Sequence, residues 1–170
     1  MQLSRRSFVV MVALAALALV ACGPSAQQVK TAREAQYRAD GNVVFRAVVD
    51  AIADKRHKIA QADASTGTVA TEPRWYEPDG TFEDKAADGQ RAMVEHGSIL
   101  LGFEVQVAPA AGTFTVTVTP RAVQVREGSA APHPLSANDP AMTSWIAGKT
   151  DDLYLAIYER LKPYAVKPGA

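Results

Sequence analysis

Residues 99–119 read ILLGFEVQVAPAAGTFTVTVT and decide the fold. Apolar side chains occupy alternate positions from Ile99 to Val107, which is the period of a strand with one buried face. Residues 109–112 are turn formers, and the alternation resumes from Phe114 to Val118. The segment predicts an antiparallel hairpin whose second strand has an exposed face made of threonines, Thr113, Thr115, Thr117 and Thr119.

Pro120 interrupts this pattern. Proline has no backbone N–H to donate to a strand ladder, and the apolar positions after it change from even to odd numbers, at Val123 and Val125. An extra residue in one strand has this effect on the side-chain phase. The pattern predicts a bulge or bend at residues 120–122.

Two amphipathic helices are expected to flank the strands. In the segment 43–55, capped by Asn42, the apolar stripe is Val44, Val48 and Ile52. In the segment 150–161, the stripe is Leu153, Ile157 and Leu161. Asp139 and Pro140 have the residue types of an N-cap and a first helical position, so they predict the start of this second helix, with a break or kink at Gly148.

A shorter hairpin is expected between the first helix and residue 99. Residues 57–63 and 68–76 are its two strands, and Gly67 supplies the turn. Residues 77–90 and 127–138 read as loops. The sequence therefore predicts an α+β fold, with a single antiparallel β-sheet of about four strands and two α-helices packed on one face. It occupies residues 41–163, between a tether at 22–40 and a disordered tail at 164–170. Two alternatives stay open for the tether: that Tyr37 docks on the domain, and that residues 31–37 form a weak helix.

The first 21 residues have the three parts of an export signal. Arg5 and Arg6 form a basic start, residues 8–20 are uncharged, and the small Ala21 ends the segment. A helix needs about 20 apolar residues to span a bilayer, so this run is too short for a transmembrane anchor.

Leu19-Val20-Ala21-Cys22 resembles the lipobox of bacterial lipoproteins. The resemblance implies cleavage between Ala21 and Cys22, fatty acyl chains such as palmitate on Cys22, and a location on the cell envelope membrane. The resemblance also implies sorting by the residue after the cysteine: Gly23, which is not an aspartate, favours the outer membrane, facing the periplasm, over the inner membrane. The alternative is a soluble secreted protein with a chance cysteine. Residues 4–9 (SRRSFV) also resemble the twin-arginine export motif, and general secretion stays open beside it.

Composition limits the function classes. The chain has 18 basic and 18 acidic residues. Arg5 and Arg6 are removed with the signal, so the mature chain has 16 basic and 18 acidic residues. A chain without a net positive charge, and with neither sign in long blocks, is not expected to bind nucleic acid. Cys22 is the one cysteine, so no intrachain disulfide is possible.

Residues 43–75 resemble small domains of bacterial envelope lipoproteins. The features are Val44-Phe45 and Val48-Val49 in the helix, followed by the spacing of Asp63, Gly67, Val69 and Thr71 in the hairpin. The nearest resemblance is to the BamC-type lipoproteins of the outer-membrane barrel-assembly machine. It implies helices packed on an antiparallel sheet and an envelope location, and it transfers no functional residue.

Candidate chemical residues form no recognisable catalytic set. His57, His96 and His133 are 39 and 37 positions apart, whereas zinc ligands come at short spacing. The acidic residues between Glu77 and Asp88 lack the spacing of a calcium loop, and no serine lies in a nucleophile motif. No catalytic residue, metal or cofactor is expected.

Three aromatic residues have two interpretations, as part of the hydrophobic core or as an exposed aromatic binding surface: Trp75, Tyr76 and Trp145. The predicted function is a lipid-anchored, non-enzymatic binding or scaffold module in envelope assembly or maintenance, with an envelope protein as partner. The alternative is a small envelope enzyme or ligand-binding protein, which a pocket between sheet and helices with two or more convergent ionisable groups would favour. A structural lipoprotein bound to the cell wall is a third option.

Overall fold

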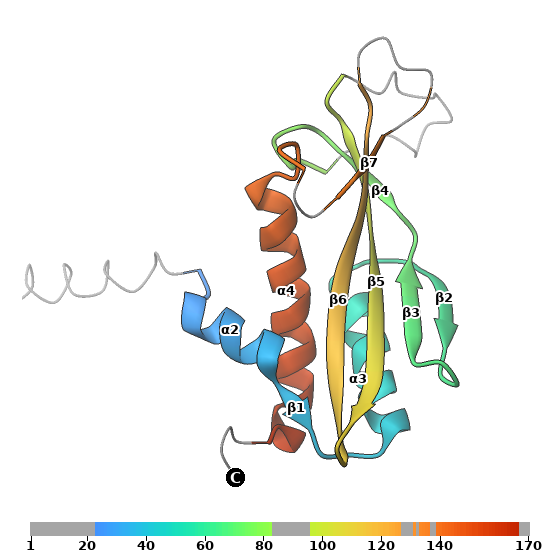
Figure 1. Cartoon of the computed structure of the whole chain (residues 1–170), viewed down its shortest axis with the longest axis vertical. Helices are drawn as coiled ribbons and strands as arrows, with labels where there is room; N and C mark the ends of the chain where they lie inside the picture. Colours follow the sequence, from blue (N-terminus) through green and yellow to red (C-terminus); the bar gives the residue numbers. More distant parts are fainter. Residues whose placement is uncertain (1–22, 83–95, 127–130, 132, 137–138, 167–170) are drawn as a thin grey trace, which may run out of the picture.

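A computed structural model describes residues 23–82, 96–126, 131, 133–136 and 139–166, and Figure 1 shows their arrangement. The α+β class with a single antiparallel sheet is confirmed. In these residues three α-helices pack with a sheet of seven strands, where two helices and about four strands were predicted. The bounds of the strands are β1 Gln36–Tyr37, β2 Ile59–Asp63, β3 Thr68–Thr71, β4 Arg74–Tyr76, β5 Ile99–Ala110, β6 Thr113–Gln124 and β7 His133–Leu135. The bounds of the helices are α2 Ala26–Glu34, α3 Gly41–Asp54, α4 Ser144–Leu161 and the short 3₁₀ helix η2 Lys162–Tyr164.

The predicted hairpin is present as β5–β6, and it forms the centre of the sheet. The strand order is β1-β6-β5-β3-β2, while β4 also pairs with β5 and β7 also pairs with β6. Alternate side chains of β5 are buried, and they are those predicted to point inward: Ile99, Leu101, Phe103, Val105 and Val107. Helices α3 and α4 pack on each other, with α3 against β5 and α4 against β6. The apolar face of the sheet therefore forms the core with these two helices.

The predicted bulge at Pro120 is wrong. The pairing of β5 with β6 runs without a shift from Ala110 opposite Thr113 to Ile99 opposite Gln124. Ala122 is buried and Val123 is half-buried, so the even-numbered inward phase continues past the proline. The N–H of Val118 points away from β5, towards α4, and the backbone nitrogen two residues later has the same direction. Pro120 thus lies where β5 needs no donor from it.

One of the four threonines is also misplaced by the sequence pattern. Thr117 and Thr119 are exposed and Thr115 is half-buried, but Thr113 is buried. Its hydroxyl donates to the carbonyl of Ala110 within the turn and contacts Gln36 of β1 at 3.2 Å. The added strand β1 covers this position.

Helix α3 agrees with its predicted stripe, since Val44, Val48 and Ile52 are fully buried. Its N-cap is Asp40, whose carboxylate accepts from the N–H of Asn42 at 2.8 Å, so the cap lies two residues before the predicted one. A carboxylate at this position satisfies an N–H that has no partner in the first turn of the helix.

Helix α4 begins later than predicted. Thr143 is its N-cap, and Asp139 instead closes a preceding turn by accepting from the N–H of Ala141 at 2.8 Å. The helix continues without a break through Gly148, which is exposed. A glycine there lowers helix propensity by about 1 kcal/mol without removing a backbone hydrogen bond. The predicted stripe Leu153, Ile157 and Leu161 is buried.

The segment predicted to be a tether is folded between residues 25 and 37. Ser25 and Gln28 form a reciprocal capping box at the start of α2, which packs against α4. Tyr37, in β1, is 1% exposed. The order at the C-terminal end extends past residue 164, where the tail was predicted to begin. Ala165 forms a β-bridge with Tyr37, and the N–H of Val166 donates to the carbonyl of Gln36 at 2.8 Å. Residues of low hydrophobicity dock here through caps and backbone pairing, which hydropathy does not reveal.

The shorter hairpin is confirmed as β2 and β3, with Gly67 at a φ of 71°. Its second strand is divided, however, because Glu72 and Pro73 separate β3 from β4. At this break the Thr71 hydroxyl accepts from the N–H of Phe103 at 2.9 Å. The predicted loop at 127–138 contains β7, which pairs with the end of β6 in antiparallel orientation.

Candidate functional site

A cleft of about 690 Å³ opens between the end of α3, strand β4 and the first half of α4. It therefore lies between the sheet, the turn that follows α3 and helix α4. Five basic side chains line it: Lys55, Arg56, Lys58, Arg74 and Lys149. The carboxylates that line it are Glu72 and Asp152, and the rings are His57, Trp75, Tyr76 and Phe82.

The cleft has a surplus of positive charge. Among the described residues, five cations face two carboxylates, in a chain whose 18 basic and 18 acidic residues balance. Lys58 and Glu72 lie 4.0 Å apart with both side chains largely exposed, so their attraction neutralises little of the field. A concave surface of one charge sign between low-dielectric walls concentrates the potential. This site favours anions.

The turn after α3 brings together three of these cations, Lys55, Arg56 and Lys58. The N–H groups of Lys55, Arg56 and His57 donate to carbonyls of the last helical turns. Arg56 has a φ of 58°, the left-handed conformation in which a helix end commonly has glycine. A residue with a Cβ pays about 1–2 kcal/mol there. The turn then carries the chain from α3 into β2.

Aromatic rings support two of the cations. The ring of Tyr76 lies 5.3 Å from that of Trp145 and 5.7 Å from that of Phe82, measured between centroids. Lys149 Nζ lies 4.8 Å from the centre of the Tyr76 ring, and the guanidinium of Arg74 lies 5.3 Å from that of Phe82. Such contacts attract a cation and restrict its side chain. Burial raises the pKa of the Tyr76 hydroxyl, against the opposing effect of Arg74.

His57 lies at the inner side of this cationic group. Its ring meets that of Phe103 edge-on at a centroid distance of 5.1 Å. Burial lowers the pKa of His57 to about 4, and the charges of Arg74, Lys149 and Lys55 act in the same direction. The imidazole is therefore neutral at pH 7. It can exchange hydrogen bonds with a ligand, but its pKa is far from the value that suits a general base at that pH.

Trp75 and Tyr76 do not form a joint aromatic patch. Tyr76 is opposite Ile99 on the inner face and is 4% exposed, whereas Trp75 is opposite Leu100. Neighbouring residues of a strand point to opposite faces of the sheet. Tyr76 is thus core and floor of the cleft. The half-buried Trp75 shares the opposite face of the sheet with Leu100, and part of Trp75 also lines the cleft.

Trp145 holds the loop after β4 in place. Its indole N–H donates to the carbonyl of Pro78 at 3.0 Å. A Cβ on Gly80 would come within 2.7 Å of the indole ring, and Gly80 also has a φ of 89°, so this position requires glycine. The carboxylate of Asp79 accepts from the N–H of Thr81, which lowers the pKa of Asp79. The start of the predicted acidic loop is thus an ordered turn against α4.

The other predicted candidates are dispersed. His96 is exposed in the turn before β5, and His133 lies in β7. Within the described ranges, no group of three or more His, Cys, Asp or Glu side chains is placed to hold a metal ion. Ala21, Cys22 and the acidic residues from 83 to 88 lie outside the described residues. Among the helices that are described, none is long and apolar enough to cross a membrane.

Sequence reasoning missed the positive charge of the cleft because its cations come from separate segments. One signal was available: residues 55–58 read KRHK, a basic run directly after an amphipathic helix. The expectation that neither charge sign runs in a block overlooked it. Arg74 and Lys149 join this run only through the pairing of β4 with β5 and the packing of α4 on α3.

Comparison with known proteins adds no assignment: no family model matches the chain, and no curated protein is similar to it in sequence.

Proposed function

We propose that the protein is a lipid-anchored, non-enzymatic binding protein of the bacterial envelope that takes an anionic ligand in the cleft between β4, α3 and α4. The observation that carries this proposal is the convergence of five cations against two carboxylates. The ligand-binding alternative raised by the sequence required a pocket between sheet and helices with two or more convergent ionisable groups. This cleft lies between the sheet, the turn after α3 and helix α4, and its lining includes convergent ionisable groups.

The proposed anchor rests on sequence. Leu19-Val20-Ala21-Cys22 resembles a lipobox, so Cys22 carries the acyl chains and Ala21 ends the signal. The export signal leads to the periplasm, and Gly23 favours the outer membrane. In this proposal, the lipid holds the protein on the membrane and the folded domain presents its cleft to the periplasm.

A binding role fits the cleft better than acid–base catalysis. General catalysis at neutral pH needs a group whose pKa lies near the working pH. His57 has a pKa of about 4, and the charged groups that act on this pKa are three cations. These cations disfavour the imidazolium that His57 would become if it abstracted a proton from a substrate.

A second candidate function is contact with an envelope protein through the outer face of the sheet. Four apolar side chains form one row across four strands, because they are partners in the strand register: Trp75, Leu100, Val123 and Pro134. The first three are half-buried and Pro134 is exposed. A partly exposed apolar row favours a protein partner in envelope assembly or maintenance.

Native mass spectrometry of the full-length lipoprotein, extracted from membranes in neutral detergent, tests the ligand-binding function. We expect the wild-type protein to retain an anionic small molecule that the Arg74→Gln/Lys149→Gln variant does not. Equal retention by both proteins, or no retained anion, would contradict the proposal. Recovery of a crosslinked protein that is lost in Leu100→Ser would instead support the outer face.

Membrane fractionation tests the anchor. We expect Cys22→Ala to leave the membrane fraction, because it has no thiol to acylate. A Ser25→Ala variant, three residues away, should remain there. A Cys22→Ala protein that stays in the membrane fraction would overturn the lipid anchor.

A further inference from the structure

We propose that the anion held by the cleft is an organic phosphate: a phosphate or pyrophosphate group bound by Arg56, Arg74 and Lys149, with its carbon body against the exposed ring of Phe82. This inference rests on the proposed function, that the cleft binds an anion, and it names the chemical class of that anion.

The number of charges separates a phosphate from a simple carboxylate. The described residues that line the cleft, five basic side chains and two carboxylates, leave a surplus of three positive charges, with His57 neutral. A monocarboxylate brings one negative charge and would leave most of this surplus in place. A phosphate monoester brings about two charges at neutral pH and a pyrophosphate ester more, so these groups match the surplus.

The types of cation also match. Arg56 comes from the turn after α3 and Arg74 from β4, and a guanidinium donates two parallel hydrogen bonds to the oxygens of one phosphate. Lys149 comes from α4 and supplies a point charge. Three separate elements thus offer hydrogen-bond donors to one anion. A phosphate fits this arrangement because its oxygens point in several directions.

Two of these cations are oriented before a ligand arrives. Lys149 lies over the ring of Tyr76 and Arg74 over that of Phe82. Restricting long side chains in advance reduces the entropy lost on binding.

The volume and the rings indicate a ligand larger than inorganic phosphate. A cleft of about 690 Å³ is in the usual range for sites of small organic molecules. Phe82 is 44% exposed although it is a large aromatic residue, and it lies beside the buried Tyr76 at the cleft. An apolar or ring-shaped carbon body would cover Phe82. The head group of a membrane lipid and a soluble phosphate ester share this chemistry.

The backbone of Arg56 gives an independent indication. Its left-handed φ of 58° would suit glycine better, yet an arginine stands there. Backbone strain that persists in a fold concentrates at functional sites. Arg56→Gly therefore separates the two roles of this residue: it relieves the backbone and removes the guanidinium.

Isothermal titration calorimetry of the full-length lipoprotein in neutral detergent tests the proposal. Phenyl phosphate and benzoate share a ring and differ in the anion, and we expect phenyl phosphate to bind at least about tenfold more tightly. Dihexanoyl phosphatidic acid, whose head group is a phosphate monoester, tests the lipid source; binding of this lipid without phenyl phosphate would support a lipid head group. Benzoate binding as tightly as phenyl phosphate would overturn the phosphate class and leave the proposed function standing. Binding of none of the three would contradict both.

Two variants control the titration. Arg56→Gly should weaken phosphate binding about tenfold, the loss typical of one charge-assisted hydrogen bond, while its melting temperature does not fall. Arg121→Gln removes an equal charge from the exposed pair with Glu104 on the central strands, outside the cleft, and should bind as the wild type does. Equal weakening by both variants would show non-specific attraction and overturn the site.

Discussion

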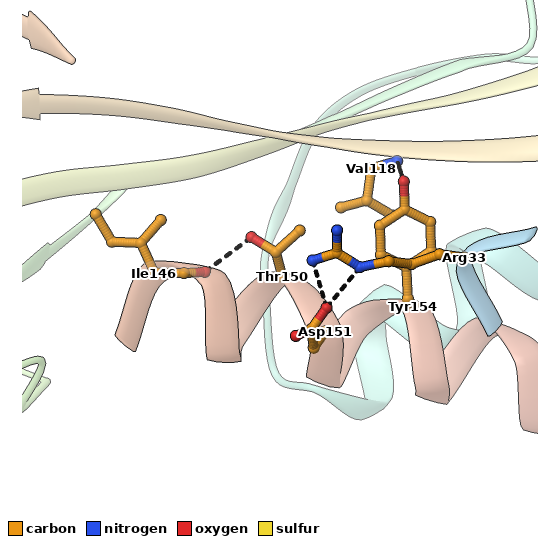
Figure 2. A network of polar contacts seen from close by, with 6 residues as sticks. All are labelled: Arg33, Val118, Ile146, Thr150, Asp151 and Tyr154. Carbon is orange, nitrogen blue, oxygen red and sulfur yellow. Dashed lines mark hydrogen bonds and ion pairs between the residues drawn. The ribbon is translucent and has the colours of Figure 1, made fainter. Parts of the chain in front are cut away.

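The hydroxyl of Tyr154 accepts a hydrogen bond of 2.8 Å from the backbone N–H of Val118 (Figure 2). β1 pairs with residues 114 and 115 of β6, and β7 pairs with residues 122–124, so Val118 lies between them on the outer edge of β6. Both residues are buried. A side chain of α4 thus completes a strand edge that no strand of the described residues covers, and fixes how α4 lies on the sheet.

Tyr154→Phe should therefore destabilise the fold. It leaves the ring in place and removes the acceptor, so a buried N–H loses its partner. We expect the free energy of unfolding to fall by about 1–3 kcal/mol in urea denaturation. Tyr164→Phe, at a tyrosine that is 41% exposed, is the matched control and should change little. Equal stability of the two variants would show that the hydrogen bond contributes nothing.

Arg33→Gln should loosen α2. The Arg33 guanidinium contacts Asp151 at 2.5 Å and lies 5.5 Å from the centre of the Tyr154 ring, so it joins α2 to α4 (Figure 2). The pair is partly exposed, and we expect a loss of about 0.5–1 kcal/mol. Hydrogen exchange should become faster in the amides of residues 26–34 and stay unchanged in β5. Unchanged exchange in α2 would mean that other contacts hold it.

Arg56→Gly should stabilise the protein, which is unusual for a substitution of a long side chain by glycine. The gain comes from a φ of 58° that glycine adopts freely. We expect about 1 kcal/mol, and a melting temperature about 2–4 °C higher. Lys55→Gly, one position earlier with a φ of −78°, has no such strain to relieve and should lower it. A lower melting temperature for Arg56→Gly would contradict the strained turn.

Acid should weaken the fold through His57. Its folded pKa of about 4 is below its ordinary value of 6.5, so the unfolded chain binds the proton more readily. The stabilising preference for the neutral ring is complete above pH 6.5 and is lost as the pH falls towards 4. His57→Phe keeps a ring beside Phe103 and has no proton to bind. Its urea midpoint should fall less than that of the wild type between pH 6.5 and 4.5; parallel curves would contradict the lowered pKa.

The parts of the fold that could be predicted are those where side-chain periodicity reports burial. The alternation from Ile99 to Val118 and the stripes of α3 and α4 are of this kind, and all are in the structure. The position of Pro120 depends on which edge of β6 lacks a neighbour, and the start of α4 depends on whether Asp139 caps a helix or a turn. Periodicity carries neither fact.

The cleft was predictable in its position and not in its content. The pocket between sheet and helices was an alternative, and KRHK at residues 55–58 was visible in the sequence. Arg74 and Lys149 are 75 residues apart, and only tertiary packing brings them to the same cleft. Tyr76 was recognised as an important aromatic residue, but its role as the surface under Lys149 required the contact of α4 with β4.

The most direct test of the cationic cleft is the pKa of His57, measured by NMR in the full-length protein with and without saturating phenyl phosphate. Burial and three neighbouring cations should hold this pKa near 4 in the free protein. An anion bound among those cations should raise it by about one unit, because a nearby negative charge favours the imidazolium. A His57 pKa near 6.5 in the free protein, or one that does not move when phenyl phosphate binds, would contradict the account.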